Sequence, residues 1–291
     1  MKTLRTSEAA ALLNVSPNTL RSWERRFDYP KPLRSPGRHR LYMHAEIIAL
    51  RDALQDGLSI SSAVSAAREA IGADGDAMLK AFLAFSEDEA DAAMERSLAL
   101  RTVERSVEEL LLPSLAAIRR RRGARSAQAA FAQRWSADWL MRARRLTAVS
   151  DRRWALLVGD ASSPVLDTAR PSILAFELCC VRAGFELMSL PVQAPEGLDE
   201  AIETLVPDAI VIAGNYATDD EVARWAYRVR SLVVGCPFVL YLREIDGVVT
   251  APSPRVLPNS PLAAQAELLS LLAASDPRGD SGGSRGALKV T

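Results

Sequence analysis

The spacing of apolar residues along the chain divides it into three regions. Up to Thr147, apolar residues recur at the helical period, which predicts amphipathic helices. From Arg153 onward, short apolar runs alternate with helical segments, the pattern of a parallel sheet covered on both faces. The last segment, Asp276–Thr291, is rich in Gly, Ser and Arg and is expected to be a disordered tail. The sequence therefore predicts a multidomain protein of the α plus α/β class.

The N-terminal region predicts two short helices joined by a turn. Thr6–Leu13 is Ala-rich, and Asn14 is suited to a left-handed exit from that helix. Ser16 is placed to cap the second helix, with Pro17 at its first position, where a missing N–H does no harm. Such a helix–turn–helix places its second helix in the major groove of DNA.

The second helix has an apolar and a basic side. Leu20, Trp23 and Phe27 share one face. The remaining circumference holds polar and basic residues, namely Arg21, Ser22, Arg25 and Arg26. One side can pack while the other meets phosphates and base edges. Trp23 fits either role, because an aromatic residue at this spacing is as often core as interface.

Residues 30–42 alternate turn formers with basic side chains. Pro36 and Gly37 favour a tight turn, so the segment predicts a two-stranded wing with this pair at its tip. The basic residues of the wing are Lys31, Arg34, Arg38, His39 and Arg40.

Charge separates the head of the chain from its body. Residues 1–51 hold ten Lys and Arg against four Asp and Glu, a net charge of +6. The whole chain has 36 of each, so the remainder carries 26 against 32, a net of −6. A zero total therefore conceals a basic head with the electrostatic footprint of a nucleic-acid-binding surface. A solvated basic face without a partner is the alternative.

The runs TSEAAALLNVSPNTLRSWERRF and RSPGRHRLY resemble the winged-helix head of MerR-family transcription regulators, over roughly the first 70 residues. The resemblance implies that the second helix lies in the major groove and that the wing grips phosphate through Arg38, Arg40 and Tyr42. Glu24 is expected to orient an arginine or to satisfy the helix surface rather than to touch DNA. The full set of expected DNA-binding residues is Ser16, Asn18, Thr19, Arg21, Ser22, Trp23, Arg25, Arg26, Arg34, Arg38, His39, Arg40 and Tyr42.

Helices are expected to follow the wing. Two of them, 45–56 and 62–70, close the DNA-binding domain 1–72, and Asp74-Gly75 is expected to break the pattern. Four more, 76–85, 86–100, 103–122 and 127–147, predict a four-helix bundle over 76–149, with Pro113 breaking or kinking the third. The Arg119–Arg122 run with Arg125 is either a second patch for DNA or an acidic partner, or a solvated helix end.

The third region, 152–275, predicts an open parallel sheet with flanking helices. Apolar strands are expected at 154–159, 185–190, 207–214 and 237–242, with helices at 172–183, 198–205, 219–231 and 263–274. Such sheets bind ligands at the carboxyl ends of their strands, so Asp160–Asp167, Pro191–Pro195 and Asn215–Thr218 are the expected rim of a pocket. The first strand is followed by no G-x-G-x-x-G and the chain holds no Walker sequence, so neither dinucleotide nor ATP binding is supported.

The bundle and sheet together resemble the paired helical and cobalamin-binding domains found behind a MerR-type head in light- or cobalamin-responsive repressors. There the histidine of a D-x-H-x-x-G motif holds the cobalt, whereas the corresponding positions here are Asp167, Ala169 and Ser172. Alanine offers cobalt no lone pair, and the only histidines, His39 and His44, lie in the head. The W-x9-E-H signature of the bundle is also missing; Arg134-Trp135 aligns best, and Trp135 with Trp139 is expected to fill the cofactor's space. The resemblance thus implies a retained fold with a degenerate motif, without cofactor or metal.

These observations predict a cytoplasmic transcription regulator that binds double-stranded DNA at an inverted repeat as a homodimer or higher homo-oligomer. The sequence shows no signal peptide and no apolar run able to span a bilayer, and its three cysteines form no metal-binding set. A regulatory protein partner is one expected means of control. The alternatives are a regulator responding to a small molecule or to cobalamin bound without histidine, and an oligomerisation or interaction scaffold. An enzyme is disfavoured, because Asp160, Ser162, Ser163 and Asp167 have no histidine in the body to act with.

Overall fold

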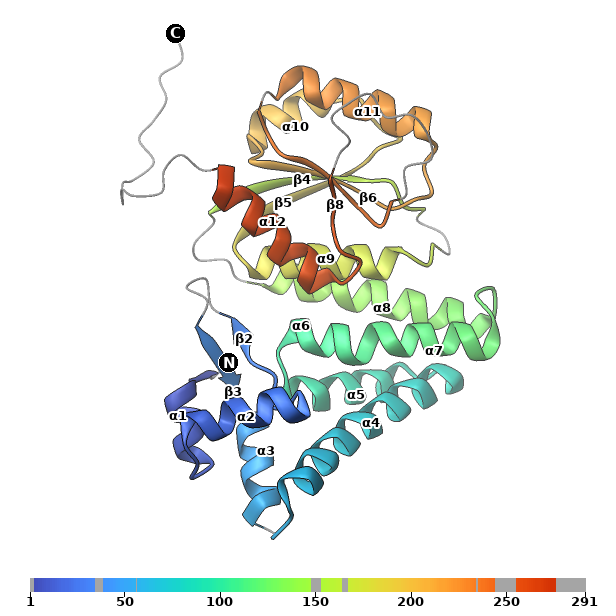
Figure 1. Ribbon diagram of the computed structural model, residues 1–291. Helices are drawn as coiled ribbons and strands as arrows, with labels where there is room; N and C mark the ends of the chain where they lie inside the picture. The colour runs from blue at the N-terminus through green and yellow to red at the C-terminus, as the bar shows by residue number, and fades with distance from the viewer. Residues whose placement is uncertain are drawn as a thin grey trace. The chain divides into compact units, whose positions relative to one another are not determined.

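A computed structural model of the chain describes residues 3–34, 39–55, 57–147, 153–163, 167–233, 235–243 and 255–275 (Figure 1). The chain forms two compact units, Met1–Arg142 and Ala143–Thr291. It is a mixed α/β structure, as the sequence predicts. None of the described helices is long and apolar enough to cross a membrane.

The first unit opens with a small head of helices around a three-stranded antiparallel sheet. Its elements are β1 (Thr3–Arg5), α1 (Thr6–Leu12), α2 (Pro17–Phe27), β2 (Leu33–Arg34), β3 (Arg40–Met43) and α3 (His44–Gln55). The strand order is β1-β3-β2, with Leu4 opposite Tyr42 and Leu33 opposite Leu41. The chain therefore folds back so that its first strand lies beside the strand that ends the hairpin.

The local signals at the start of α2 are confirmed. The hydroxyl oxygen of Ser16 accepts a hydrogen bond from the Thr19 amide at 3.0 Å, and Pro17 occupies the first turn. Asn14 lies in the left-handed region with φ of 53°, as expected for a short polar residue leaving a helix. The apolar face of α2 then packs into the head's core, where Leu20 is fully buried and Trp23 and Phe27 are partly buried.

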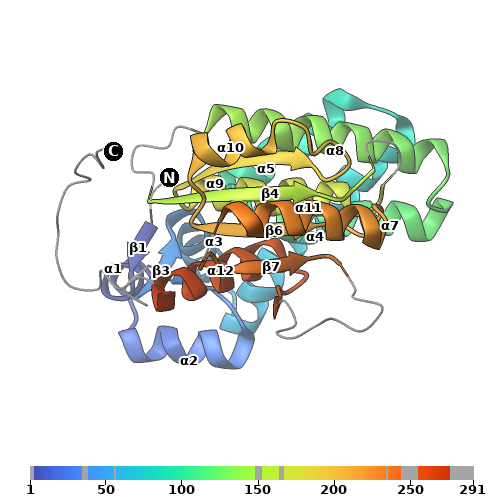
Figure 2. The ribbon, with the colours of Figure 1, turned by 90° about the horizontal axis from the view of Figure 1, so that it is seen from above.

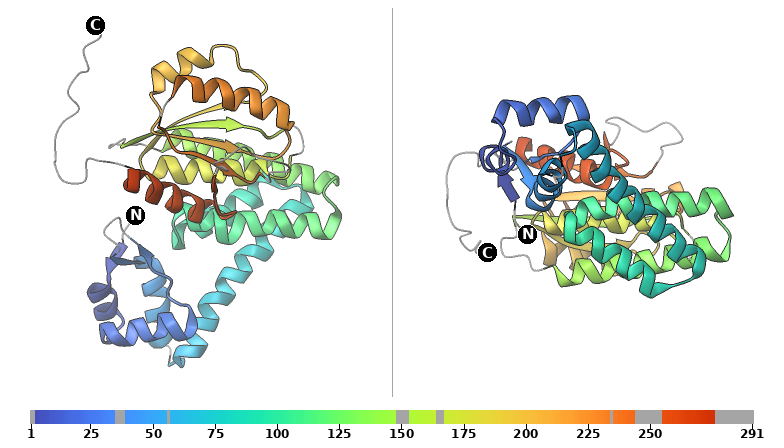
Figure 3. Two further views of the ribbon diagram at one scale, coloured as in Figure 1. Left: turned by 45° about the horizontal axis from the view of Figure 1, so that its top comes forward. Right: turned by 90° about the horizontal axis from the view of Figure 1, so that it is seen from below.

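The remainder of the first unit is helical, and one predicted break is wrong. The helices are α4 (Ile60–Ala84), α5 (Glu87–Leu100), α6 (Val103–Ser106), a π-helical segment η1 (Val107–Leu111), α7 (Leu112–Arg122) and α8 (Ala127–Leu146). The helix α4 runs without interruption through Asp74-Gly75, where a break was predicted (Figure 3). A glycine costs a helix only about 1 kcal/mol, and tertiary packing of residues such as Met78 and Phe82 outweighs that cost. The predicted boundary between 72 and 76 therefore falls inside a single helix.

Pro113 affects the helix 103–122 by widening it. The proline follows Leu112, whose amide bonds to the carbonyl of Val107, five residues back, as in a π-helix. Proline has no N–H to continue the α-helical ladder, so the chain accommodates it with this widened turn. The segment is therefore neither broken nor a regular α-helix.

Trp135 lies in the core of the helical part. It is 4% exposed, and its ring meets that of Phe82 edge to face, with centroids 5.8 Å apart. This packing joins α8 to α4. The residue is thus a core side chain of the first unit.

The second unit is a five-stranded parallel sheet with helices on both faces. The strands β4 (Trp154–Asp160), β5 (Phe185–Pro191), β6 (Ala209–Ala213), β7 (Phe238–Tyr241) and β8 (Arg255–Val256) are ordered β5-β4-β6-β7-β8. Figure 2 shows β4, β6 and β7 side by side. The helices are α9 (Arg170–Arg182), α10 (Leu198–Leu205), α11 (Asp219–Leu232) and α12 (Pro261–Ser275). The four predicted strands and helices are confirmed, and the short edge strand β8 was not predicted.

Alternate residues of the strands supply two separate cores. Leu156 and Val158 face α9 and α12, whereas Leu157 faces α10 and α11. On the second face the fully buried ring of Trp225 lies against Gly159, where a Cβ would come within 2.8 Å of it. Gly159 is therefore needed for the strand to approach α11 this closely.

Candidate nucleic-acid interface

A cleft of about 440 Å³ lies on the head, between the starts of α1 and α2 and the strand β3. Its lining is Arg5, Thr6, Ser7, Pro17, Arg21, His39 and Arg40. No acidic side chain is among these lining residues. Arginine side chains from three elements thus converge on one hollow, an arrangement suited to a polyanion such as a phosphate backbone.

The polar side of α2 divides into structural and accessible residues. Ser16 and Thr19 bond to each other, Oγ to Oγ1 at 2.8 Å, and together form the helix cap. Asn18 accepts a long hydrogen bond, 3.4 Å, from the guanidinium of Arg21. Beyond Pro17 and Asn18 in its first turn, the exposed residues of this helix are Arg21, Ser22, Arg25 and Arg26. The helix therefore presents three arginines, the first of which lines the cleft.

Glu24 orients the wing arginine, as its position in the sequence suggested. Its carboxylate accepts hydrogen bonds from Nε of Arg40 at 3.0 Å and from the hydroxyl of Tyr42 at 3.2 Å. The Arg40 side chain stays one-third exposed, so its remaining guanidinium nitrogens can reach a ligand. Glu24 thus acts on the cleft through Arg40.

Among the candidates that the structure describes, Tyr42 is assigned a different role from the predicted one. Its side chain is fully buried in the head's core, and burial together with the nearby Glu24 carboxylate raises the pKa of its hydroxyl to about 12. A buried side chain offers no surface to DNA, so Tyr42 cannot grip phosphate directly. It instead fixes Glu24, and through Glu24 it fixes Arg40.

The other wing candidates differ in how far the structure describes them. His39 is exposed and lines the cleft. Arg34 pairs with Arg40 across β2 and β3 through its backbone. Arg38 lies outside the described residues, as does the predicted turn at Pro36-Gly37.

Besides Pro17, which was predicted only as the first residue of a helix, three lining residues were not predicted, namely Arg5, Thr6 and Ser7. They join the cleft because β1 pairs with β3, which brings the start of α1 beside the wing. A basic residue directly before the first predicted helix was the available signal. The strand pairing that gives it meaning is a long-range contact and is not visible in the local pattern.

The carboxyl edge of the parallel sheet is the second place where a ligand could bind, and its polar groups are engaged internally. Asp160 pairs with Arg170 at 2.8 Å, and the same guanidinium donates to the Ser162 hydroxyl at 3.1 Å. Asp167 accepts from the amides of Ser163 and Ala169, both at 2.8 Å, so it shapes the turn into α9. The residues considered for catalysis are therefore tied to one another or to the backbone.

Hydrogen bonds between loops draw this edge together. The carbonyl of Ala161, after β4, accepts from the amides of Tyr216 and Ala217, after β6, at 3.0 and 2.9 Å. Gly214 has φ of +102°, and a Cβ on it would lie 2.9 Å from the Ser162 nitrogen. The loops after β4 and β6 are thus in close contact.

A buried arginine completes the packing of the edge. The guanidinium of Arg243 donates to the carbonyls of Gly214 and Ala217, at 3.4 and 3.2 Å, and pairs with Asp219. Its side chain is only 5% exposed. Arg243 therefore bonds to the carbonyl groups of the loop that follows β6.

The donor set at this edge does not fit a cobalt ion. Ala169, the position that the motif gives to histidine, has no ligand atom, and both histidines of the chain belong to the first unit. Within the part of the chain that the structure describes, no group of three or more His, Cys, Asp or Glu could hold a metal. Cys179 and Cys180 are buried in α9, and burial raises the pKa of the Cys180 thiol.

The basic lining of the cleft is suited to a polyanion. Residues 5–42 match the family model described as MerR family regulatory protein, so the N-terminal segment is a MerR-family domain. The HTH-type transcriptional repressor CarA of Myxococcus xanthus is 40% identical over 68 residues, which are 22% of this chain and 24% of that protein. The HTH-type transcriptional regulator MlrA of Escherichia coli strain K12 is 39% identical over 57 residues, 19% of this chain and 24% of that protein. The match thus spans about a quarter of each curated relative.

Two solved structures resemble a larger part of the chain, but only weakly. The methanol:cobalamin methyltransferase complex MtaBC from Methanosarcina barkeri is 12% identical, with a TM-score of 0.33, covering 68% of this chain and 78% of that one. A novel cobalamin-binding protein from Desulfitobacterium hafniense DCB-2 is 9% identical, also with a TM-score of 0.33, covering 69% and 98%.

Proposed function

We propose that the protein is a DNA-binding transcription regulator whose MerR-type winged helix–turn–helix reads DNA with α2 and grips the backbone from the wing. The observation that carries this proposal is the basic cleft, in which Arg5, Arg21 and Arg40 converge from three elements. Arg21 lies on the exposed side of α2 and is the candidate for base contact. Arg40 is held by Glu24 and is the candidate for phosphate contact.

The expected site is an inverted repeat bound by a homodimer or higher homo-oligomer. The helix α2 has 11 residues and can reach only a few base pairs. Two heads on neighbouring turns of the duplex multiply the discrimination of one. A two-fold arrangement of heads therefore accounts for useful specificity from so short an element.

The first experiment selects a preferred duplex from a random pool and measures its affinity by fluorescence anisotropy at several salt concentrations. Arg21→Ala should lose about 1–3 kcal/mol of binding free energy and relax the preference at one base pair. Arg40→Ala should weaken all sequences alike and lower the salt slope by about 1. Arg228→Ala, which removes a half-exposed arginine of the second unit that pairs with Asp199, serves as the control.

The outcomes separate clearly. A wild-type chain that enriches no sequence and shows no salt-dependent binding would refute the proposal. If Arg40→Ala altered the preferred sequence while Arg21→Ala did not, the roles given to these two residues would be reversed.

The second unit is proposed to keep the fold of a sensor domain without binding cobalamin. Ala169 supplies no cobalt ligand, so constitutive DNA binding and control by a protein partner are the two modes of regulation that we consider beside small-molecule sensing. The test is the absorption spectrum after incubation in the dark with adenosyl- or methylcobalamin and desalting. A colourless protein that still binds its duplex is expected, whereas a retained corrin band would make the chain a cobalamin-responsive regulator that binds without histidine.

A further inference from the structure

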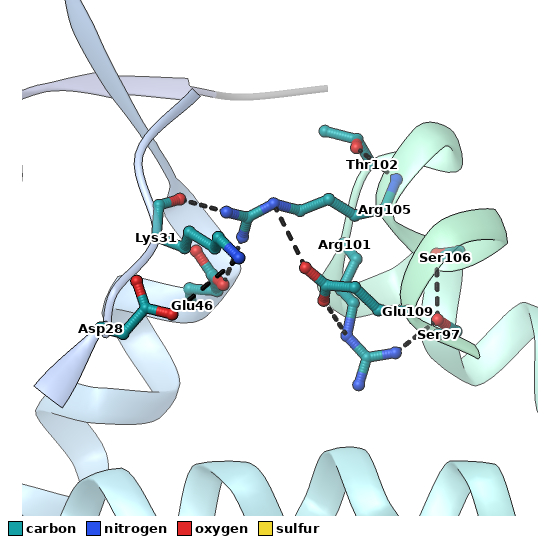
Figure 4. Close-up of polar contacts among 9 residues, drawn as sticks. All are labelled: Asp28, Lys31, Glu46, Ser97, Arg101, Thr102, Arg105, Ser106 and Glu109. Atoms are coloured by element: carbon teal, nitrogen blue, oxygen red, sulfur yellow. Dashed lines mark hydrogen bonds and ion pairs between the residues drawn. The ribbon is translucent and has the colours of Figure 1, made fainter. Parts of the chain in front are cut away.

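A buried cluster of charged side chains joins the head to the helices that follow it. Arg105, in α6, reaches across to the head, where its Nη1 donates to Oε1 of Glu46 at 2.7 Å and its Nη2 donates to the carbonyl oxygen of Lys31 (Figure 4). On its own side, its Nε lies 3.8 Å from Glu109. The side chains of Arg105 and Glu46 are only 5% and 8% exposed.

The two head residues that Arg105 contacts bracket the wing in sequence. Lys31 lies two residues before β2, and Glu46 lies in the first turn of α3, three residues after β3 ends at Met43. One guanidinium therefore bonds to the chain on both sides of the hairpin that carries Arg40. The base of the wing is held by a residue from outside the head.

Arg105 is itself held in place by its neighbours. Glu109 also approaches Arg101, at 3.9 Å, and Arg101 donates to the Ser97 hydroxyl at 2.7 Å. The Ser97 hydroxyl in turn donates to that of Ser106 at 2.9 Å. Side chains from α5, α6 and η1 thus fix the guanidinium before it crosses to the head.

The cluster is better suited to fixing geometry than to adding stability. Charges buried together lose their hydration, so apolar residues of similar volume would join the two parts at least as firmly. Oε2 of Glu46 has no hydrogen-bond partner among the described residues, which leaves Arg105 as the donor that orients this carboxyl group. Directed bonds of this kind allow one arrangement of wing and helices.

We propose that Arg105 is a positioning residue for DNA binding, which holds the base of the wing so that Arg40 meets the phosphate backbone. The inference rests on the proposed function. The widened turn η1 begins two residues after Arg105 and carries Glu109, and such turns are frequent at functional sites. A shift of α6 or η1 would therefore move the wing without altering α2.

The test is a double-mutant cycle on the duplex selected with the wild-type chain. The affinity cost of Arg40→Ala is measured in the wild-type and in the Arg105→Met background, and the cost of Arg21→Ala is measured in the same two backgrounds. We expect the Arg40→Ala factor to shrink by at least about threefold when Arg105 is absent, within the range seen for interacting residues. The factor for Arg21→Ala should stay the same, because α2 is placed by the head's own core.

Two results would overturn the proposal. An Arg40→Ala factor that is equal in both backgrounds would show that the wing does not depend on Arg105. Equal shrinkage of the Arg21→Ala and Arg40→Ala factors would show that Arg105 only maintains the fold of the head. A wild-type chain that selects no duplex would instead refute the proposed function, so the two failures are distinguishable.

Variants that retain the fold keep the test decisive. If Arg105→Met does not give native far-UV circular dichroism, the double variant Arg105→Met/Glu46→Leu replaces the buried pair by apolar residues, an exchange that is often neutral for stability. Arg105→Lys keeps the charge, but its ammonium group cannot bond to Lys31 and Glu46 at the same time as a planar guanidinium does. The affinity factor for Arg40→Ala should therefore also shrink in the Arg105→Lys background, but by less than in the Arg105→Met background. Arg228→Ala again serves as the surface control.

Discussion

Arginine is used in opposite ways at the two candidate binding regions of this molecule. On the head, Arg5, Arg21 and Arg40 line a cleft that no acidic residue enters. At the carboxyl edge of the parallel sheet, Arg170 and Arg243 instead bond to two aspartates, a hydroxyl and two loop carbonyls. The cleft arginines therefore keep guanidinium groups accessible to an outside anion, even though Glu24 orients Arg40, whereas Arg170 and Arg243 are engaged within the fold.

The difference shows that a fold's usual binding position does not by itself make a site. The edge of the sheet is where such folds bind ligands, yet here its polar groups are engaged by the chain's own arginines. The head has only a small core, but its arginine side chains converge on one hollow. Function is better inferred from which groups the side chains already bond to than from their position in the fold.

The largest effect on stability is expected when Arg243, the buried arginine at the carboxyl edge of the sheet, is replaced. Arg243→Met leaves two loop carbonyls without their donor, and the free energy of unfolding of the second unit should fall by roughly 3–5 kcal/mol. Hydrogen exchange of β6 peptides across a urea series measures this loss. Arg228→Ala in the same unit should leave exchange unchanged, and DNA affinity should be unaffected in both variants. A stable Arg243→Met protein would mean that the edge does not need its internal arginine.

The next largest effect concerns the charged cluster behind the head. Burial raises the pKa of Glu46 from its ordinary 4.5 to about 7. The nearby charges of Arg105 and Arg101 lower this pKa, and that of Glu109 raises it further. The folded state thus holds this proton more tightly than the unfolded chain. Its stabilising effect is complete below pH 4.5 and is lost as the pH rises through 7, by up to about 3 kcal/mol.

Urea unfolding of the first unit at pH 5 and pH 8 measures this dependence. Glu46→Gln, which cannot titrate, should flatten the difference between the two pH values. If the wild type and Glu46→Gln lose stability equally over this range, another group must be responsible.

A smaller effect should follow from removing an exposed arginine of α2 outside the cleft. Arg25→Ala should weaken every duplex modestly and lower the salt slope by about 1, because a phosphate contact carries no sequence information. Arg26 lies over the ring of Phe27, 5.2 Å from its centroid, so Arg26→Ala is a matched comparison in which packing is also lost. A change of preferred sequence in Arg25→Ala would place this residue at a base edge.

The smallest effect is expected from restoring the degenerate motif. The double variant Ala169→His/Ser172→Gly supplies an imidazole, yet the loops after β4 and β6 remain bonded to each other and to Arg243. Desalting after incubation with cobalamin should again give a colourless protein. A corrin band in this variant alone would show that the missing histidine, and not the packed edge, prevents binding.

The local signals of the sequence predicted elements well where neighbours in sequence decide the structure. The cap at Ser16, the left-handed Asn14 and the alternation of strands and helices in the second unit all depend on residues a few positions apart. The predicted break at Gly75 is wrong for the opposite reason. Whether a helix passes a glycine depends on what it packs against, and those partners lie far away in the chain.

The candidate site shows the same limit. The residues on α2 could be listed from helical spacing, but Arg5 joins them only because β1 pairs with β3. The MerR-like motif predicted that Tyr42 contacts phosphate from the surface, although its ring faces the core. Arg105 and Arg243 carry no local signal of their roles, because an arginine's partner is set by the tertiary fold.

The unbroken course of α4 has a consequence for anyone who wishes to exchange heads between regulators. A cut near residue 72 would divide a helix that spans roughly 37 Å and would expose its inner face on both fragments. The natural junction lies earlier, at Gly57–Ser59, where a glycine with φ of +81° precedes the cap of α4. On the new head, a chimaera joined there must also present a backbone carbonyl at the position of Lys31 and a carboxylate at that of Glu46. Modularity in this chain is thus limited less by the linker than by the contacts that a transplanted head would have to reproduce.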